Sequence, residues 1–398
     1  MNTNSQNSSE FMKGLGSNEK ALLERIPILF LRKFAVKIVR LKMRFQFTGW
    51  LQYLLPLIFV TLFAIVGGAL TLFNVHFLSI PFLAIGTLIF VIALFDLLTV
   101  KFQLRFPERL PKRKDRLDLF DLMQERRSCR SFQTRKLTKS DFNEIMESVR
   151  THSKAQKIGK EPVRFEYLSA PLNVWPVVNA TEFLVAIAPR EYNRLANIDI
   201  GRSLQKVVID ATRMGLGTCW IGPGADQRSI AKNLGNRFDS EKDHIVCVCA
   251  IGYPSNYIPI FLRIFNAQFR KRLPLSELFF ADIDSEQPLD LETVPFNRFG
   301  RNYEVCQWAP SSYNGQTTRC LANSDPNGHL KSFDFYTTTA SRYYAPVALG
   351  IWCANWELGC NQLGIPGHFT VLSPTERHAT QNHAPLPKYD LSWVPDVD

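Results

Sequence analysis

The clearest pattern along the chain is a long apolar stretch near its N-terminal end. Residues 45–95 contain no Asp, Glu, Lys or Arg, a length more than twice the ~20 residues that one transmembrane helix needs. Asn74-Val75-His76 interrupts the stretch, so we predict one span over residues 50–73 and a second over residues 77–100. Residues 49–100 therefore read as a transmembrane helical hairpin. Asp96, close to the basic end of the second span, is expected at the membrane interface.

Basic residues flank the predicted hairpin on both sides, and its turn has none. By the positive-inside bias, both termini and the region after the hairpin are expected in the cytoplasm. Residues 19–48 form a basic amphipathic segment, which is either a helix lying on anionic headgroups or a plain extension of the first span. Residues 1–18 are rich in Asn and Ser and are expected to be disordered. Residues 101–118 form a basic linker with two prolines.

After the linker, helical and strand periodicities alternate. Thr138 is a predicted N-cap, because Asp141 follows in the first turn and apolar residues then recur at helical spacing. A second, longer helix is predicted over residues 199–214, ended by Gly215. Continuous apolar runs predict buried strands. These strands cover residues 182–188, 218–221 and 245–253.

A second and shorter series follows. We predict a helical stretch over residues 298–308, a strand over 333–338 and a long apolar helix over 345–363. The expected core residues of this last helix are Leu349, Trp352, Trp356 and Leu363. Because both series pair a short helix with strands and a long buried helix that ends in glycine, we interpret them as a diverged internal duplication. The expected fold is α+β, with one half over residues 119–285 and the other over 286–398.

Charge and cysteine usage exclude several classes of function. The net charge is +11, but residues 1–116 hold 16 Lys+Arg against 6 Asp+Glu, and the remainder is almost neutral. The soluble part therefore lacks the basic surface that nucleic-acid binding requires. All eight cysteines follow residue 116, and their spacing matches no zinc site. We expect Cys247 and Cys249, which alternation would place on one face of a buried strand, to be small core residues. Reduced thiols fit a cytosolic compartment, and we expect no metal.

Four segments carry residue types suited to binding a cofactor. Each segment alone also fits an ordinary surface loop or basic turn. Arginines at close spacing can hold a phosphate through paired donors, and small polar turns let the backbone approach an aromatic ring. The candidate residues are Arg126, Arg127, Ser128 and Arg130 in the first segment; Gly222 and Gly224 after the Gly215–Ile221 stretch; Arg270 and Arg272; and Pro310, Ser311, Ser312, Asn314 and Gln316.

The order and combination of these segments resembles the nitroreductase family of FMN oxidoreductases. The similarity is greatest to the compact branch in which one chain holds both half-folds. The resemblance implies that Arg126, Arg127, Ser128 and Arg130 bind the phosphate, ribityl and pyrimidine parts of FMN, and that Arg270 and Arg272 complete the phosphate site. The Pro310–Gln316 segment would take the part played by a partner subunit. Gly222 and Gly224 would face flavin N5.

The resemblance also implies an activity. NAD(P)H would supply two electrons through FMN to a nitroaromatic, quinone or similar acceptor, and no side chain would act as a nucleophile. Thr317 and Thr318 stand where the family usually has Pro and Trp, which leaves open a degenerate flavin-binding sensor or membrane scaffold. Each motif occurs once, so we expect one FMN site in a monomeric pseudo-dimer. The expected partners are the lipid bilayer and a small-molecule acceptor.

Overall fold

The computed structural model describes residues 23–396, except 48, 173, 223, 269, 326 and 378–385. The disorder predicted for residues 1–18 lies outside these described residues. The chain divides into two compact units. The first comprises Met1–Arg105 with Asn173–Trp175 and Pro259–Leu262, and the second comprises the remaining residues. The predicted linker thus begins close to the division at residue 105.

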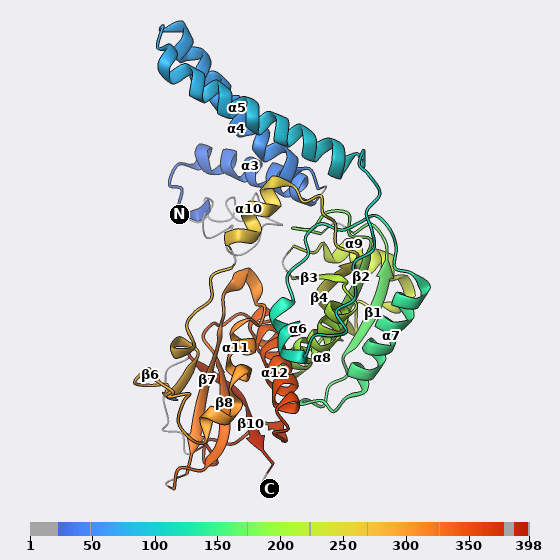
Figure 1. Ribbon diagram of the computed structural model, residues 1–398, viewed down its shortest axis with the longest axis vertical. Helices are drawn as coiled ribbons and strands as arrows, with labels where there is room; N and C mark the ends of the chain where they lie inside the picture. The colour runs from blue at the N-terminus through green and yellow to red at the C-terminus, as the bar shows by residue number, and fades with distance from the viewer. Residues whose placement is uncertain are drawn as a thin grey trace, which may run out of the picture. The chain divides into compact units, whose positions relative to one another are not determined.

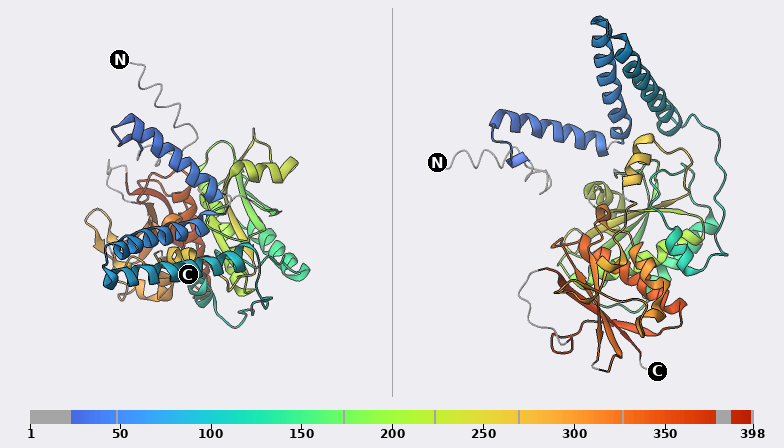
Figure 2. Two further views of the ribbon diagram at one scale, coloured as in Figure 1. Left: turned by 90° about the horizontal axis from the view of Figure 1, so that it is seen from above. Right: turned by 60° about the vertical axis from the view of Figure 1, so that its left-hand side comes forward.

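The first unit is helical (Figures 1 and 2). It contains α3 (Leu29–Phe47), α4 (Leu51–Leu72) and α5 (His76–Asp96), which continues as the π-helical turn η1 (Leu97–Lys101). Helices α4 and α5 form a hairpin at the predicted turn, and both are long and apolar enough to cross a membrane. Glycines permit their close packing, because a Cβ at Gly67 would lie 2.7 Å from the Leu83 side chain.

The second unit begins with helices around a four-stranded antiparallel sheet of order β1-β2-β4-β3. Its strands are β1 (Arg164–Ser169), β2 (Glu182–Pro189), β3 (Gly217–Ile221) and β4 (Asp243–Gly252). Its helices are α6 (Leu119–Glu125), α7 (Lys139–Lys154), α8 (Arg194–Arg213), α9 (Gln227–Leu234) and the 3-10 turn η2 (Gly235–Arg237). The predicted cap is confirmed, because the Thr138 hydroxyl accepts from the Asp141 N–H at 3.2 Å.

A six-stranded sheet of order β6-β5-β7-β8-β10-β9 follows. Its strands are β5 (Phe279–Asp282), β6 (Gln287–Pro288), β7 (Thr318–Ser324), β8 (Leu330–Thr337), β9 (Gly367–Thr370) and β10 (Lys388–Pro395). The accompanying helices are α11 (Arg301–Gln307) and α12 (Tyr344–Gln362), and α10 (Ile260–Gln268) precedes the sheet in the chain. The 3-10 turns are η3 (Leu275–Glu277), η4 (Phe296–Phe299) and η5 (Ser312–Asn314).

The two sheets share one topology. Strands β7-β8-β10-β9 repeat the order β1-β2-β4-β3, all neighbours in both sets are antiparallel, and a long helix joins the second strand to the third in each. These helices are α8 and α12, which lie side by side in the unit (Figure 1). The predicted α+β fold is confirmed, and the repeated strand order supports the predicted internal duplication.

Helices α8 and α12 cross at a pair of glycines. A Cβ added to Gly201 would lie 2.2 Å from the Val347 carbonyl oxygen, and one added to Gly350 would lie 1.9 Å from the Ile198 carbonyl oxygen. Gly201 follows Ile198 by three residues, as Gly350 follows Val347. This reciprocity is the pattern of an isologous contact, in which residue i meets j and j meets i. The helices thus meet as two equivalent subunits would.

One hydrophobic core joins both sheets and both helices. It includes Cys247 and Cys249 of β4, Leu204 of α8, Trp356 of α12 and Phe333 of β8. The two thiols that alternation placed on one face of a buried strand are core residues, as predicted. All eight cysteines are free. Within the part of the chain that the structure describes, no group of His, Cys, Asp and Glu could hold a metal ion.

Four boundaries or placements differ from the sequence predictions. Helix α8 begins five residues earlier than predicted, because the Asn193 side chain caps it by accepting from the Ala196 N–H at 3.0 Å. Gly300, at a φ of +41°, breaks the predicted helix 298–308 into η4 and α11. Leu363, expected in the core, follows the end of α12 and is 38% exposed. Strand β5 pairs with β7, so the second sheet begins before residue 286.

Candidate functional site

The Arg126–Arg130 segment runs beside the glycine-rich strand. It leaves α6 at Arg126, and the Cys129 N–H donates to the Thr218 carbonyl at 2.8 Å. Ser128 forms a parallel bridge with Thr218. An added Cβ at Gly217 would lie 2.7 Å from Cys129 Sγ, so β3 can approach this segment only with glycine there. Two of the four candidate segments are therefore neighbours.

Two arginines from two candidate segments lie over one indole ring, and the charge of a third arginine, Arg126, interacts with theirs. The guanidinium carbons of Arg127 and Arg272 lie 5.0 Å and 5.3 Å from the centroid of the Trp308 ring. Arg126 is buried, with 5% of its surface exposed. Burial, followed by the charges of Arg272 and Arg127, lowers the pKa of Arg126 to about 10. Burial and then Arg127 lower the pKa of Arg272 to about 10.

The lowered pKa values mean that the surroundings of Arg126 and Arg272 disfavour the charged form of each side chain. Arg126 and Arg272 remain protonated at neutral pH, yet within the described residues neither they nor Arg127 forms an ion pair with a carboxylate. Arg272 has only neutral acceptors, and its Nε is buried without a hydrogen-bond partner among them. Opposite charge nearby favours the charged form of an arginine. An anion bound here would therefore relieve the repulsion of the three guanidinium groups.

The 309–316 loop holds Arg272 in place. Arg272 Nη1 donates to Asn314 Oδ1 at 2.7 Å and to the Ala309 carbonyl at 3.2 Å. Asn314 Nδ2 donates to the Lys271 carbonyl at 2.7 Å, and the Leu273 N–H donates to Gln316 Oε1 at 2.9 Å. The side chains of Asn314 and Gln316 are thus engaged with residues 271–273. Their observed contacts position an arginine, whereas the sequence predicted cofactor contacts.

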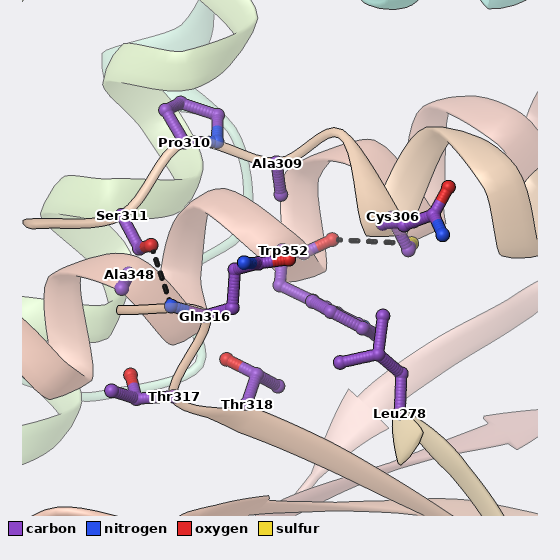
Figure 3. Close-up of a pocket in the computed structure, with 11 residues that line it drawn as sticks. Leu278, Cys306, Ala309, Pro310, Ser311, Gln316, Thr317, Thr318, Ala348 and Trp352 are labelled. Carbon is purple, nitrogen blue, oxygen red and sulfur yellow. Dashed lines mark hydrogen bonds between the residues drawn. The ribbon is translucent and has the colours of Figure 1, made fainter. Parts of the chain in front are cut away.

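The same loop has an unusual backbone. Tyr313, Asn314 and Gln316 have φ values of 51°, 55° and 46°. Residues other than glycine rarely adopt this left-handed conformation, which persists only where surrounding contacts enforce it. The Ser311 hydroxyl supplies one such contact by accepting from the Gln316 N–H at 2.9 Å (Figure 3). Three such residues within four positions are typical of a strained functional loop.

Arg130 points to a different partner. It donates through Nη1 to Asn266 Oδ1, and its guanidinium carbon lies 5.2 Å from the centroid of the Phe265 ring. Arg130 Nε is buried and has no hydrogen-bond partner within the described chain. Arg130 is thus available for a further acceptor, but no hydrogen bond joins it to the arginines around Trp308.

The remaining candidates divide into close and distant residues. Gly222 lies against Tyr344, since an added Cβ would meet Tyr344 Cε1 at 2.4 Å. Gly224 is buried, and the residue before it lies outside the described part. Arg270 is exposed, and within the part of the chain that the structure describes no side-chain hydrogen bond joins it to the arginine cluster. Pro310 and Ser312 are half-buried in the strained loop.

A small cavity lies beneath this loop (Figure 3). Its walls include Pro310, Ser311, Gln316 and, from α12, Ala348 and Trp352. The volume of about 10 Å³ suits about one water molecule. The cavity cannot hold an isoalloxazine ring, so the arginines and not this cavity define the candidate site.

The duplicated fold contains a counterpart of this loop, at residues 155–163 before β1. Here Asp199 of α8 accepts from the Ile158 N–H at 2.9 Å and from the Gly159 N–H at 2.8 Å. Lys157 Nζ donates to the Ser203 hydroxyl at 3.2 Å. The nearby cation Arg202 is paired with Glu357 at 2.7 Å. The counterpart loop is therefore tied to α8 by hydrogen bonds, and the cation Arg202 beside it has a carboxylate partner.

The residues present fit the phosphate of FMN. A phosphate monoester is a compact dianion that paired guanidinium donors recognise well, and the buried Nε groups of Arg130 and Arg272 are unpaired among the described residues. Sequence reasoning missed Trp308, which precedes the Ala309-Pro310 motif directly, and Asn266. Trp308 could have been suspected from its position, but nothing in the sequence signals the pairing of Asn266 with Arg130.

The chain is similar to known proteins in its sequence and its fold. The family model described as "Putative TM nitroreductase" matches residues 118–359. A nitroreductase structure from Thermotoga maritima is 15% identical, covers 73% of this chain and 96% of its own, and has a TM-score of 0.42. A nitroreductase with bound FMN from Bacteroides fragilis is 16% identical, with coverages of 35% and 89% and a TM-score of 0.30.

The NfrA1 nitroreductase of B. subtilis is 20% identical, with coverages of 42% and 78% and a TM-score of 0.33. No curated protein matches the chain. The identities and TM-scores of the solved structures are low, so the assignment rests on the family model, which matches more than half of the chain. This protein belongs to the nitroreductase family.

Proposed function

We propose that this protein is a membrane-anchored, FMN-dependent oxidoreductase that passes two electrons from NAD(P)H to a nitroaromatic, quinone or similar acceptor. The observation that carries the proposal is the group formed by Arg126, Arg127 and Arg272, two of which lie over Trp308. Within the described chain, this group forms no ion pair with a carboxylate. Buried like charges repel one another, so an anion bound among them would stabilise the group. The family makes FMN the expected anion.

Each candidate residue then has a definable task. Arg126, Arg127 and Arg272 would hold the phosphate, and Ser128 would add a hydroxyl near them. Arg130, through its unpaired Nε, would face the pyrimidine edge. When bound, FMN supplies the hydride-accepting and hydride-donating chemistry. Asn314 and Gln316 would act as positioning residues, because their side chains hold Arg272 and Leu273.

A single FMN per chain follows from the unequal halves. The loop at 309–316 positions a cation without an acidic partner, whereas its counterpart at 155–163 is pinned to α8 by Asp199. We therefore propose a monomeric pseudo-dimer with one site. Pro310, Ser311 and Ser312 would supply the side of the site that a second subunit supplies in dimeric relatives.

The bilayer is the proposed partner of the N-terminal unit. Two helices are long and apolar enough to cross a membrane, and the basic flanks favour a cytoplasmic site. A site held close to a membrane favours a lipophilic electron acceptor such as a quinone. The competing function is a flavin-binding sensor or scaffold without turnover, which the unusual Thr317 and Thr318 favour.

Flavin analysis of the full chain purified in detergent tests the proposal. We expect yellow protein that releases one FMN per chain on denaturation, and anaerobic bleaching of the flavin absorbance by NADH or NADPH. Reoxidation by a soluble quinone would establish the acceptor class. Colourless protein whose melting temperature does not respond to added FMN would refute flavin binding. Bound flavin that neither nucleotide reduces would support the sensor.

A further inference from the structure

Helix α3 carries two exposed stripes of opposite character. Its exposed bases Lys33, Lys37, Arg40 and Arg44 recur at helical spacing along one side. Exposed apolar residues at similar spacing form the adjacent side. These residues are Phe30, Phe34, Ile38 and Leu41, of which Phe30 is 75% and Phe34 55% exposed. Helix α3 contains no acidic residue.

The third side of α3 is already packed within the first unit. Val36 is 2% exposed and packs in a small cluster with Leu23, Ile26, Val39 and Met43. Arg32 closes this cluster, because its Nε donates to the Ile26 carbonyl at 2.9 Å. The exposed stripe is therefore not the face on which α3 folds against its own N-terminal segment.

Helix α3 is also separate from the first span. The Trp50 N–H donates to the Phe45 carbonyl at 3.0 Å and the Gly49 N–H to the Gln46 carbonyl at 3.2 Å, while Gly49 has a φ of +72°. This arrangement is a Schellman motif, which ends a helix and turns the chain. Figure 2 shows α3 leaving the α4–α5 hairpin at a large angle. A plain extension of the span, one of the two sequence interpretations, is therefore wrong.

We infer that α3 lies on the surface of an anionic membrane, with Phe30, Phe34, Ile38 and Leu41 among the acyl chains and the adjacent basic stripe at the phosphate level. The inference rests on the proposed membrane anchoring. Charge complementarity selects the occupant, because the exposed row of bases on α3 suits phospholipid phosphates. The chain itself supports the same choice, since α4 begins only four residues after α3 ends.

Lipid photo-crosslinking tests this placement. The full chain, carrying a photoreactive phenylalanine analogue at Phe34, is reconstituted in vesicles of phosphatidylcholine with or without phosphatidylglycerol. The same analogue at Val36 is the matched control. We expect Phe34 to label lipid, more strongly when phosphatidylglycerol is present, and Val36 to label only protein. Replacing Lys33, Lys37, Arg40 and Arg44 with Gln should lower Phe34 labelling several-fold in the anionic vesicles and leave it unchanged in neutral ones.

Three outcomes would overturn the inference. They are equal lipid labelling at Phe34 and Val36, labelling of a second copy of the chain from Phe34, and labelling that does not respond to the Gln variant. Alkaline extraction of the same vesicles separates this failure from failure of the anchor. If the protein stays with the membrane but Phe34 does not label lipid, α3 is misplaced while the hairpin stands; if the protein is released, the anchoring proposal fails.

Discussion

At the scale of single residues, the candidate site is defined by arginines that form no ion pair with a carboxylate among the described residues. Arg126 and Arg272 are buried cations whose neighbours are other cations and neutral acceptors. The sequence could nominate both arginines from their motifs. It could not predict that Trp308 would lie beneath two guanidinium groups, because that contact joins residues 181 and 36 positions apart only in the folded chain.

Replacing Arg272 with Gln should weaken FMN binding. A charge-assisted hydrogen bond contributes about 1.5–3 kcal/mol, so Kd should rise roughly 10- to 150-fold. Fluorescence titration with FMN measures the change. Arg270→Gln is the matched control, because Arg270 is exposed and should shift Kd by less than about threefold. Equal effects of the two variants would show that Arg272 does not contact the phosphate.

The pairing of Glu357 with Arg202 and Lys206 should make stability depend on pH. Burial raises the pKa of Glu357, but the hydrogen bond from Arg202 and the charge of Lys206 outweigh it, so the pKa is lowered overall from 4.5. A depressed carboxyl pKa stabilises the fold above about pH 4.5, and this stabilisation is lost as pH falls through the folded-state value.

Glu357→Gln should therefore destabilise the protein by roughly 3 kcal/mol at pH 7, the low end of the range for breaking a buried pair. The difference from wild type should shrink below pH 4.5, as measured by thermal unfolding midpoints across pH. Glu304→Gln, at an exposed position of α11, serves as the control. A Glu357 effect that is constant with pH would contradict the ion-pair explanation.

At the scale of elements, the sequence predicted features that depend on local signals better than features that depend on contacts between distant segments. Thr138 and Gly215 were identifiable from cap and stop chemistry, and the apolar runs located β2 and β4. The start of α8 was missed because Asn193 outweighed the weaker apolar pattern of residues 194–198. The pairing of β5 with β7 was missed because parallel partners come from contacts distant along the chain.

The α8–α12 crossing should not tolerate a side chain at its glycines. In Gly350→Ala the new Cβ would lie 1.9 Å from the Ile198 carbonyl, so the helices must separate. We expect destabilisation of at least about 1–3 kcal/mol, visible in the thermal midpoint. Asn361→Ala, exposed on the same helix, should leave the midpoint nearly unchanged. A Gly350→Ala protein as stable as wild type would mean that the helices are not held this closely.

At the scale of the whole molecule, the duplicated fold predicts how flavin content responds to dilution. Both sides of the proposed site belong to one chain, so no association step precedes cofactor binding. We expect an FMN stoichiometry of one and a Kd that does not change with protein concentration, measured by titration over a wide concentration range with light scattering to report the oligomeric state. A stoichiometry of one per two chains, or affinity that falls on dilution, would place the site between chains.

The glycine crossing of α8 and α12 has a consequence for how the protein can change. When two identical subunits meet on a two-fold axis, every substitution occurs twice and must be acceptable on both sides. Here the equivalent positions Gly201 and Gly350 are encoded separately. A substitution in one half of the fold therefore need not be acceptable in the other half. That freedom explains how the loop at 309–316 can position Arg272, which has only neutral acceptors among the described residues, while the loop at 155–163 is tied to α8 through Asp199 and Lys157, without either half compromising the other.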